Sequence, residues 1–239
     1  WDFPSGIDTV VNLAAHFGGI GIANLVAAQN VNTQGVLHLT EVCQASSVKH
    51  LIHVSTIFST LPVTSPFYSA YSLTKRQGEE LAYFAARNTE LALTILRPSQ
   101  LYGPVARFRR LQPFFYTVLS RAASNQEILF HGSHDAVRNF IHVDDVAQMI
   151  ALCVERPVEG IFNCAAQENL TYGQLARTAI DAFGSRSKIR FDSKYRNTPD
   201  NGFVLDELLY RHLDFFPRIS LADGISRLTD ELHLLRDVS

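Results

Sequence analysis

A tyrosine and a lysine stand four residues apart in the stretch YSLTKRQGE, Tyr71 to Glu79. Residues four apart face the same side of an α-helix, about one turn from each other. An ammonium group beside a phenol stabilises the phenolate and lowers the pKa of the tyrosine, which suits proton transfer. The pair therefore predicts acid–base chemistry at Tyr71 and Lys75. The alternative is a surface helix with an exposed lysine and a half-buried tyrosine.

A hydroxyl group precedes this pair, at the end of the apolar run HLIHVST. Thr56, or alternatively Ser55, closes the run. Open α/β sheets bind their ligands at the carboxyl ends of the strands. A hydroxyl at such an end can hydrogen-bond a reacting oxygen that exchanges its proton with Tyr71.

The elements that would position these residues alternate along the first half of the chain. Continuous apolar runs predict buried parallel strands at residues 9–15, 50–56 and 91–97, and helical periodicity predicts helices at 35–44 and 71–87. Strand–helix–strand units with right-handed crossovers build a doubly wound parallel sheet. The predicted fold class is therefore α/β.

The pattern changes after Gly103-Pro104, where shorter strands and amphipathic helices follow. We expect residues 1–104 to form most of the sheet domain, which also receives elements from residues 139–164. Residues 105–239 are expected to form mainly a smaller α+β lobe, interleaved with the sheet domain. Its predicted elements are a helix within residues 111–123, strands at 128–130 and 139–142, a helix at 144–154, a strand at 161–164, a helix opened by the capping box Thr171-x-x-Gln174, and a last helix opened by Ser220-x-x-Asp223.

The composition argues against several functional classes. The chain has 239 residues and a formal net charge of −2, without a long basic run, which argues against nucleic-acid binding. No apolar run approaches the roughly 20 residues of a membrane span. Cys43, Cys153 and Cys164 are far apart and lack metal-ligand spacing, so we expect buried free thiols, no metal site and a cytoplasmic location.

Several motifs follow one another in a definite order. They are DTVVNLAAH, AAQNVNTQGVLHLTEVC, HVST, YSAYSLTK, RPSQLYGP, HGSHDAVRNFIHVDDVAQMI, GIFNCAA and FFPRISLADGI. In this order, and over nearly the whole chain, they resemble the extended short-chain dehydrogenase/reductase family, the NAD-dependent epimerase/dehydratase group that acts largely on nucleotide sugars. The resemblance implies a Rossmann-like sheet domain, a substrate-binding lobe, and NAD or NADP as cofactor.

The resemblance also implies roles for individual residues. Tyr71 would transfer the proton, Lys75 would assist it and bond the nicotinamide ribose, and Thr56 would bond the carbonyl. The residues that would lie along the cofactor are Ala14, Ala15, Asn32, Tyr71, Lys75 and Pro98.

Two further positions are implied to contact the substrate. Arg138 resembles an arginine that binds a nucleotide diphosphate, and its alternative role is a salt bridge to Asp144 or Asp145. Gln100 stands where many relatives carry an asparagine that contacts the substrate phosphate.

The chain departs from the family pattern at two places that bear on function. The glycine-rich fingerprint expected before everything else is missing, and the glycines of HFGGIGIANL lack the acidic residue that would follow such a fingerprint. Because the family order makes the first strand here the fourth of the sheet, we expect about 60 residues before Trp1 in a complete relative. Ile57 and Phe58 replace an Asp-Glu pair of the sugar 4,6-dehydratases, which disfavours water elimination.

The predicted function is hydride transfer on a nucleotide sugar, as an epimerase or a reductase, with NAD or NADP. One alternative is a reductase or dehydrogenase of a small non-nucleotide carbonyl compound. Another is a truncated, inactive member that serves as a binding module.

The family also implies a possible homodimer through the helices at 35–44 and 71–87. His50, His53 and His142 lie on predicted strands and are expected to pack rather than to react.

Overall fold

The computed structural model describes residues 3–234, which form two compact units. The sheet unit contains the chain up to Ser99 together with Ala147–Cys164 and Asp206–Phe215. The second unit contains Gln100–Val146, Ala165–Leu205 and the chain from Phe216 onward. The three residues predicted to be catalytic, Thr56, Tyr71 and Lys75, all belong to the sheet unit.

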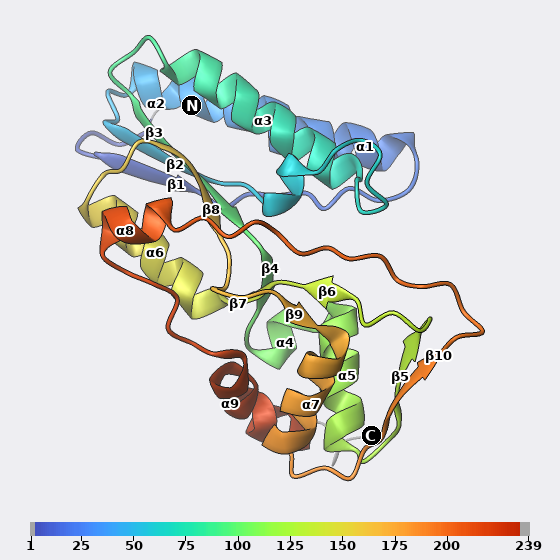
Figure 1. Ribbon diagram of the computed structural model, residues 1–239. Helices are drawn as coiled ribbons and strands as arrows, with labels where there is room; N and C mark the ends of the chain where they lie inside the picture. Colours follow the sequence, from blue (N-terminus) through green and yellow to red (C-terminus); the bar gives the residue numbers. More distant parts are fainter. Residues whose placement is uncertain (1–2, 235–239) are drawn as a thin grey trace. The chain divides into compact units, whose positions relative to one another are not determined.

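Four parallel strands form the centre of the sheet unit, in the order β1-β2-β3-β8. They are β1 (Thr9–Asn12), β2 (His50–Val54), β3 (Ala92–Pro98) and β8 (Gly160–Cys164). The register pairs Leu51 with Val10 on one side and with Leu93 on the other. Figure 1 shows α1 (Ile22–Gln29), α2 (Gly35–Ala45) and α3 (Ala70–Ala86) on one face of this sheet and α6 (Val143–Glu155) with α8 (Leu208–Leu213) on the other. This confirms the predicted α/β class with a doubly wound parallel sheet.

One long helical segment crosses between β1 and β2. It consists of α1 (Ile22–Gln29), a π-helical turn η1 (Asn30–Gln34) and α2 (Gly35–Ala45), without a break. The sequence predicts only the last of these, because α1 is mostly exposed and shows little periodic burial. Two consecutive side chains of the π-turn, Asn32 and Thr33, are buried, and single π-turns of this kind often occur at functional sites.

Helix α3 (Ala70–Ala86) packs against both this segment and the sheet. Buried apolar residues join them, including Val36 from α2, Ala82 from α3, and Leu51 and Ile95 from the strands. At Gly78 the backbones come so close that an added Cβ atom would lie 2.1 Å from the carbonyl oxygen of Asn32. Only glycine fits this position.

The first two strands end earlier than the sequence predicts. β1 stops at Asn12 rather than Ala15, because the Asn12 side chain bends the following backbone by accepting a hydrogen bond from the Ala14 N–H at 3.0 Å. β2 stops at Val54 rather than Thr56, because Thr56 caps the short helix η2 (Ile57–Thr60). At the carboxyl ends of β1 and β2, the Asn12 and Thr56 side chains therefore bond the backbone of the segment that follows each strand.

The second unit is built around its own apolar core, which includes Phe115, Leu119, Phe140, Leu175 and Ile225. Its two-stranded ladders are β4 (Gln100–Tyr102) with β7 (Phe140–His142), β5 (Ile128–His131) with β10 (Ile189–Asp192), and β6 (Val137–Arg138) with β9 (Leu170–Thr171). Its helices are α4 (Val105–Phe108), α5 (Pro113–Ala123), α7 (Tyr172–Ala182) and α9 (Leu221–Leu234). The predicted capping box at the start of α7 is confirmed. The short elements β4, β10, α4 and α8 are too brief to give a periodic signal and were not predicted.

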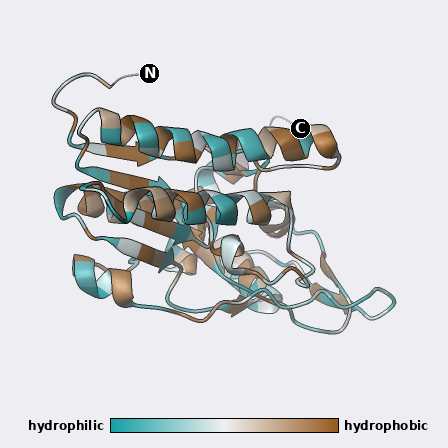
Figure 2. Cartoon of the chain, turned by 90° about the horizontal axis from the view of Figure 1, so that it is seen from above, coloured by the Kyte–Doolittle hydropathy of each residue, from teal (hydrophilic) through white to brown (hydrophobic). Residues whose placement is uncertain are grey.

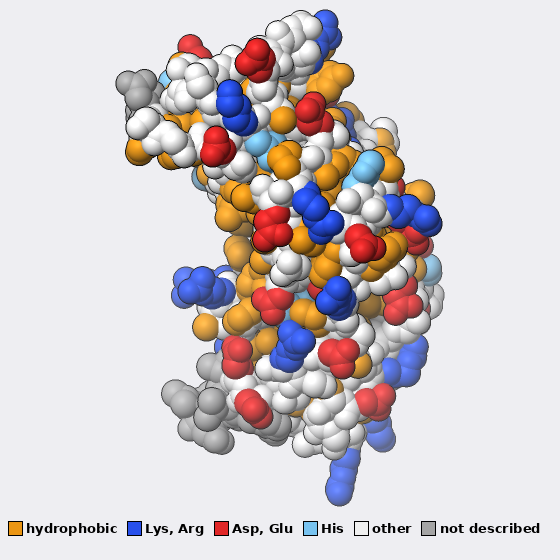
Figure 3. Space-filling model, turned by 90° about the vertical axis from the view of Figure 1, so that its left-hand side faces the viewer, with side chains coloured by type: hydrophobic (Ala, Val, Ile, Leu, Met, Phe, Trp, Pro, Cys, Tyr) orange, Lys and Arg blue, Asp and Glu red, His pale blue; other side chains and the backbone are white. Residues whose placement is uncertain are grey.

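Hydrophobic residues are concentrated on the strands, whereas the long helices carry both hydrophobic and hydrophilic positions (Figure 2). On the face shown in Figure 3, acidic and basic side chains are interspersed rather than gathered into a field of one sign. Within residues 3–234, no helix is both long and apolar enough to cross a membrane.

Replacing Gly78 by alanine tests the close approach of α3 to the π-turn. Alanine normally stabilises a helix interior by about 1 kcal/mol relative to glycine. Here the Cβ atom would overlap the Asn32 carbonyl, so we expect Gly78→Ala to lower the free energy of unfolding by about 1–3 kcal/mol in denaturant titration. Glu80→Ala, at an exposed position of the same helix, is the control. A stabilised Gly78→Ala variant would contradict the packing described.

Candidate active site

Helix α3 presents Tyr71 and Lys75 one turn apart near its beginning. The helix starts at this point because Ser69 is its N-cap, and the Ser69 hydroxyl accepts a hydrogen bond from the Ser72 N–H at 3.4 Å. An N-cap of this kind satisfies one of the free backbone N–H groups of the first turn. The cap therefore fixes which residues of α3 face the carboxyl ends of the strands.

Lys75 is fully buried, with 0% of its surface exposed. Its ammonium donates a hydrogen bond to the Val54 carbonyl, at the end of β2, over 2.8 Å. Burial lowers the pKa of Lys75 to about 8, and the negative charge of Glu79 acts in the opposite direction. Lys75 is thus a desolvated cation held at a strand end, not the exposed surface lysine of the alternative reading.

The Tyr71 phenol lies close enough to the Thr56 side chain for Thr56 to act on its pKa. Burial raises the pKa of Tyr71 to about 12, and the neighbouring Thr56 side chain lowers it by a smaller amount. The expectation that Lys75 lowers the pKa of Tyr71 is wrong for this arrangement, because the ammonium is bonded to the Val54 carbonyl and burial dominates. The Phe17 ring lies against Tyr71, with 5.2 Å between the ring centroids.

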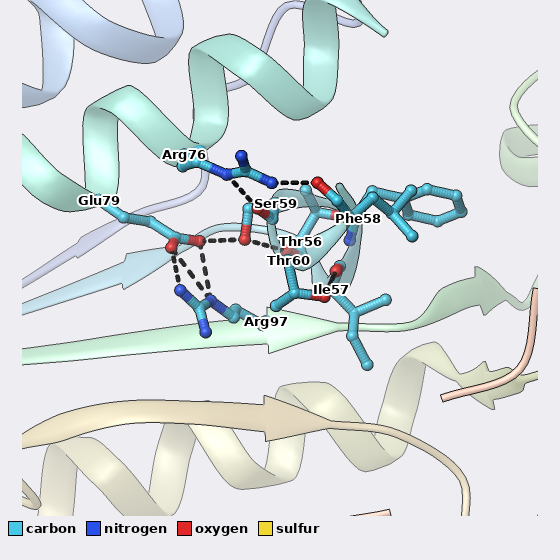
Figure 4. Close-up of polar contacts among 9 residues, drawn as sticks. Thr56, Ile57, Phe58, Ser59, Thr60, Arg76, Glu79 and Arg97 are labelled. Atoms are coloured by element: carbon cyan, nitrogen blue, oxygen red, sulfur yellow. Dashed lines mark hydrogen bonds and ion pairs between the residues drawn. The ribbon is translucent and has the colours of Figure 1, made fainter. Parts of the chain in front are cut away.

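Thr56 stands where β2 passes into η2. Its Oγ1 accepts a hydrogen bond from the Phe58 N–H at 3.3 Å, so the side chain acts as the N-cap of that short helix. Thr56 is buried. Figure 4 shows Arg76 and Glu79 of α3 in contact with the turn from Thr56 to Thr60, and Arg97 of β3 paired with Glu79. The structure thus brings together all three residues predicted to be catalytic, since Thr56 acts on the pKa of Tyr71 and Lys75 bonds the strand end that precedes Thr56.

Asn32 bonds protein groups on two sides. Its side-chain oxygen accepts the His16 N–H at 2.8 Å, and its amide donates to the His16 carbonyl at 2.7 Å and to the Thr74 hydroxyl at 2.9 Å. Thr33, the next residue of the π-turn, donates to the Thr74 carbonyl at 2.9 Å. Asn32 therefore ties the loop after β1 to α3, one residue before Lys75.

The other residues expected along a cofactor lie at the ends of neighbouring strands. Ala14 and Ala15 are exposed and lie two and three residues after the end of β1. Pro98 is the last residue of β3 and pairs with Cys164 of β8. Since the strands are parallel, these ends lie at one edge of the sheet, the same edge as Thr56 and Val54.

Two polar residues of this edge, Asn12 and His53, were not predicted as site residues. His53 on β2 is fully buried and its ring nitrogen Nδ1 lies 3.1 Å from the Asn12 amide nitrogen. Burial, reinforced by the charge of Lys75, lowers the pKa of His53 well below its usual value, so the ring is neutral. Among the described residues, His53 Nε2 and the Ser55 hydroxyl are buried without a hydrogen-bond partner. The sequence signal that could have indicated His53 as a site residue is its position as a polar residue within the otherwise apolar run HLIHVST.

Gln100 and Arg138 belong to the second unit. Gln100 donates from its side chain to Gln112 at 3.3 Å. Arg138 donates to the carbonyls of Val137 at 2.6 Å and Pro199 at 3.0 Å, and its guanidinium lies 4.8 Å from the centroid of the Tyr172 ring. Asp144 and Asp145 contact other groups, namely Arg227 and the backbone of residues 218–219.

No group of three or more His, Cys, Asp or Glu side chains is arranged to hold a metal ion in residues 3–234. The three cysteines are buried free thiols, as the sequence predicts.

A family model described as the NAD dependent epimerase/dehydratase family matches residues 2–165. The chain belongs to this family. The match covers the whole stretch that carries Thr56, Tyr71 and Lys75, so the enzyme class predicted from the sequence is confirmed.

Individual members of the epimerase/dehydratase family are distant in sequence. YtcB of Bacillus subtilis, named an uncharacterized UDP-glucose epimerase, is 24% identical over 96% of this chain and 75% of its own length. A dTDP-glucose 4,6-dehydratase of Streptomyces niveus is 25% identical over 94% of this chain and 69% of its own. The crystal structure of UDP-glucuronic acid 4-epimerase from Bacillus cereus in complex with NAD superposes with a TM-score of 0.77, at 21% identity, over 96% of this chain and 75% of that one. The structural likeness confirms the fold.

Replacing Lys75 by methionine, a side chain of similar length, tests the burial of its charge. The pKa of Lys75 falls from 10.5 to about 8 on folding, so between these values the unfolded chain binds a proton that the folded chain does not. The folded state therefore gains stability as the pH rises through this window. We expect the unfolding free energy of the wild type, relative to Lys75→Met, to increase by about 2 kcal/mol between pH 8 and pH 10.

The titration of Tyr71 contributes equally to both proteins and cancels in this difference. Lys49→Met, which removes an exposed lysine, is the matched control. A difference that stays flat between pH 8 and pH 10 would show that Lys75 is not desolvated as described.

Proposed function

We propose that this chain catalyses NAD(P)-dependent epimerisation or reduction of a nucleotide sugar, with Tyr71, Lys75 and Thr56 as its acid–base group. The observation that supports the proposal is the fully buried Lys75 ammonium, bonded to the end of β2 beside Thr56, with Tyr71 one turn away on the same helix at the carboxyl edge of a parallel sheet. Family membership adds the cofactor class.

The residues at this edge fit one end of a dinucleotide. Exposed Ala14 and Ala15 offer small side chains along which a flat ring or ribose can lie. The buried His53 Nε2 and Ser55 Oγ, which have no partner among the described residues, leave polar groups for a ligand to satisfy. Lys75 would bond the ribose, and Pro98 would border the ring. When bound, NAD or NADP supplies hydride transfer to and from a sugar carbon.

The chain's own residues would manage the accompanying proton. With a pKa of about 12, Tyr71 is protonated at neutral pH and so is set to donate to a carbonyl oxygen. Thr56 would hold the same oxygen by a hydrogen bond. In the reverse direction, Tyr71 would act as its phenolate and accept the proton of the sugar hydroxyl. Lys75, with a pKa of about 8, is largely protonated at pH 7.

Water elimination is less well supported than epimerisation or reduction. The two positions after Thr56 hold Ile57 and Phe58, and Ile57 is buried. The carboxylate near this turn belongs to Glu79, which is paired with Arg97. A carboxylate in an ion pair is a poor general acid at neutral pH. The family's dehydratase activity is therefore not the one proposed.

We infer that the second unit binds the sugar nucleotide through Arg138 and Gln100. A guanidinium suits a diphosphate because its planar fork matches two phosphate oxygens. One observation favours the second candidate, a reductase of a small carbonyl compound without a nucleotide. Arg138 already donates to two backbone carbonyls, which gives it a structural role.

Tyr71→Phe tests the proposal in the intact protein supplied with NAD or NADP. Removing one hydroxyl deletes the proton carrier, and general acid–base catalysis contributes about 10²–10⁴-fold. We expect turnover of UDP- or dTDP-sugars, followed by chromatography of the products, to fall by a factor in this range while cofactor affinity stays nearly constant. Tyr83→Phe, on an exposed part of the same helix, is the control and should retain full activity.

Ordinary activity in Tyr71→Phe would refute the assigned chemistry. Wild-type turnover of small carbonyl compounds, with none of UDP- or dTDP-sugars, would favour the second candidate.

A further inference from the structure

The turn that carries Thr56 is fastened to α3 by a set of polar contacts that the proton chemistry does not itself use. This turn comprises residues 56–61 and is called the Thr56 turn below. The contacts come from Arg76 and Glu79, which follow Lys75 by one and four residues, and from Arg97 on β3 (Figure 4). They suggest that α3 does more than carry Tyr71 and Lys75.

Arg76 holds the far end of the Thr56 turn. Its Nε donates to the Ser59 carbonyl at 2.6 Å, and its Nη2 donates to the Leu61 carbonyl. Two donors of one planar guanidinium therefore bind two carbonyls of the same turn. Such a two-point contact restricts the orientation of the turn as well as its distance from α3.

Glu79 holds the near end through Ser59. The Ser59 hydroxyl lies 2.7 Å from Glu79 Oε1 and 2.8 Å from the Thr56 carbonyl oxygen. Ser59 is buried, and so is the Glu79 side chain, at 2% exposure. Since a serine hydroxyl has one proton, the Ser59 proton is shared between these two acceptors, and this hydroxyl links the carboxylate to the backbone of Thr56.

Arg97 fixes the carboxylate from the sheet. Its Nε lies 3.1 Å and 3.0 Å from the two Glu79 oxygens, and its Nη2 also contacts Oε2. A buried ion pair of this kind adds little net stability, because desolvation of the charges offsets their attraction. Its geometry is nevertheless well defined, since the fork holds the carboxylate in one orientation.

The same carboxylate acts on Lys75. The titratable groups around the Lys75 ammonium are His53 from β2 and, on its own helix, Tyr71 and Glu79. Of these, Glu79 carries the negative charge that raises the pKa of Lys75 against the effect of burial. Glu79 is therefore linked to the hydroxyl donor on one side and to the ammonium on the other.

We propose that Glu79, oriented by Arg97 and connected through Ser59, is a positioning residue that sets the Thr56 hydroxyl and the charged Lys75 together for the reaction. The catalytic step assigned to this geometry rests on the proposed function. The positioning itself is a property of the folded chain and can be measured without substrate.

The kinetic test uses two substitutions and one control in the intact protein. Ser59→Ala cuts the link to Thr56 but leaves the Glu79–Arg97 ion pair in place, and Glu79→Gln removes the charge. Misplacement of a reacting group by about 1 Å can cost about 100-fold in rate. We expect kcat for UDP- or dTDP-sugars to fall by about 10- to 100-fold in both, with KM changed less than about twofold. Glu80→Gln, on the exposed side of α3, should match the wild type.

Two further readouts need no substrate. The sequence has four lysines, Lys49, Lys75, Lys188 and Lys194, so lysine-labelled protein gives four ammonium signals, and Lys75→Met assigns the one of interest. Titration by NMR should show the pKa of Lys75 in Glu79→Gln below its wild-type value, and unchanged in Glu80→Gln. Amide hydrogen exchange at Ser59 and Leu61, whose N–H groups bond within the turn at 3.1 and 3.2 Å, should accelerate in Ser59→Ala.

Each of these measurements either supports or overturns the positioning role of Glu79. Unchanged kcat and exchange in Ser59→Ala would overturn it, as would an unmoved Lys75 pKa in Glu79→Gln. If Glu79→Gln fails to fold because Arg97 is left unpaired, the Ser59→Ala data decide. If the wild type turns over no sugar nucleotide, the proposed function fails, while exchange and titration still support or overturn the positioning role.

Discussion

The contact between Gly78 and Asn32 is the constraint on which the site depends. Helix α3 can approach the π-turn until its backbone meets the Asn32 carbonyl, because Gly78 has no side chain. At this separation the Asn32 and Thr33 side chains reach Thr74, and Lys75 becomes fully buried. Polar groups buried in this way are stable only when their partners are in place. One missing Cβ atom therefore determines where the reactive part of α3 lies.

Because the reactive residues of α3 are close together along the chain, the position of this helix fixes the positions of all of them. Tyr71, Lys75, Arg76 and Glu79 lie within three turns of α3, and three of them contact β2 or the turn that follows it. The strand end thus receives an ammonium, a guanidinium and a carboxylate from one rigid element. Loops move more easily than helices, so a hydroxyl donor on a loop requires such an anchor to stay in register with Tyr71.

The strands and the shared helix face of Tyr71 and Lys75 could be predicted from the sequence. The features that could not be predicted depend on burial and on contacts between distant segments. Continuous apolar runs predicted the parallel strands, and the four-residue spacing predicted that Tyr71 and Lys75 share a face. The direction of the Tyr71 pKa was wrong, because spacing shows proximity but not desolvation, and burial prevails here. Asn12, His53 and Glu79 were not predicted as site residues, since their importance depends on which strand or turn folds against them. Roles assigned by resemblance, such as those of Arg138 and Gln100, stay predictions.

The central claim is that Thr56 and Tyr71 act as one unit on the same substrate oxygen. A double-mutant cycle of Thr56→Val and Tyr71→Phe in the intact protein tests this most directly, with kcat on a UDP- or dTDP-sugar as the quantity measured. Residues that act as a unit give strongly non-additive effects. The account predicts that the double variant is little slower than Tyr71→Phe alone. Losses that multiply, as for independent residues, would contradict it.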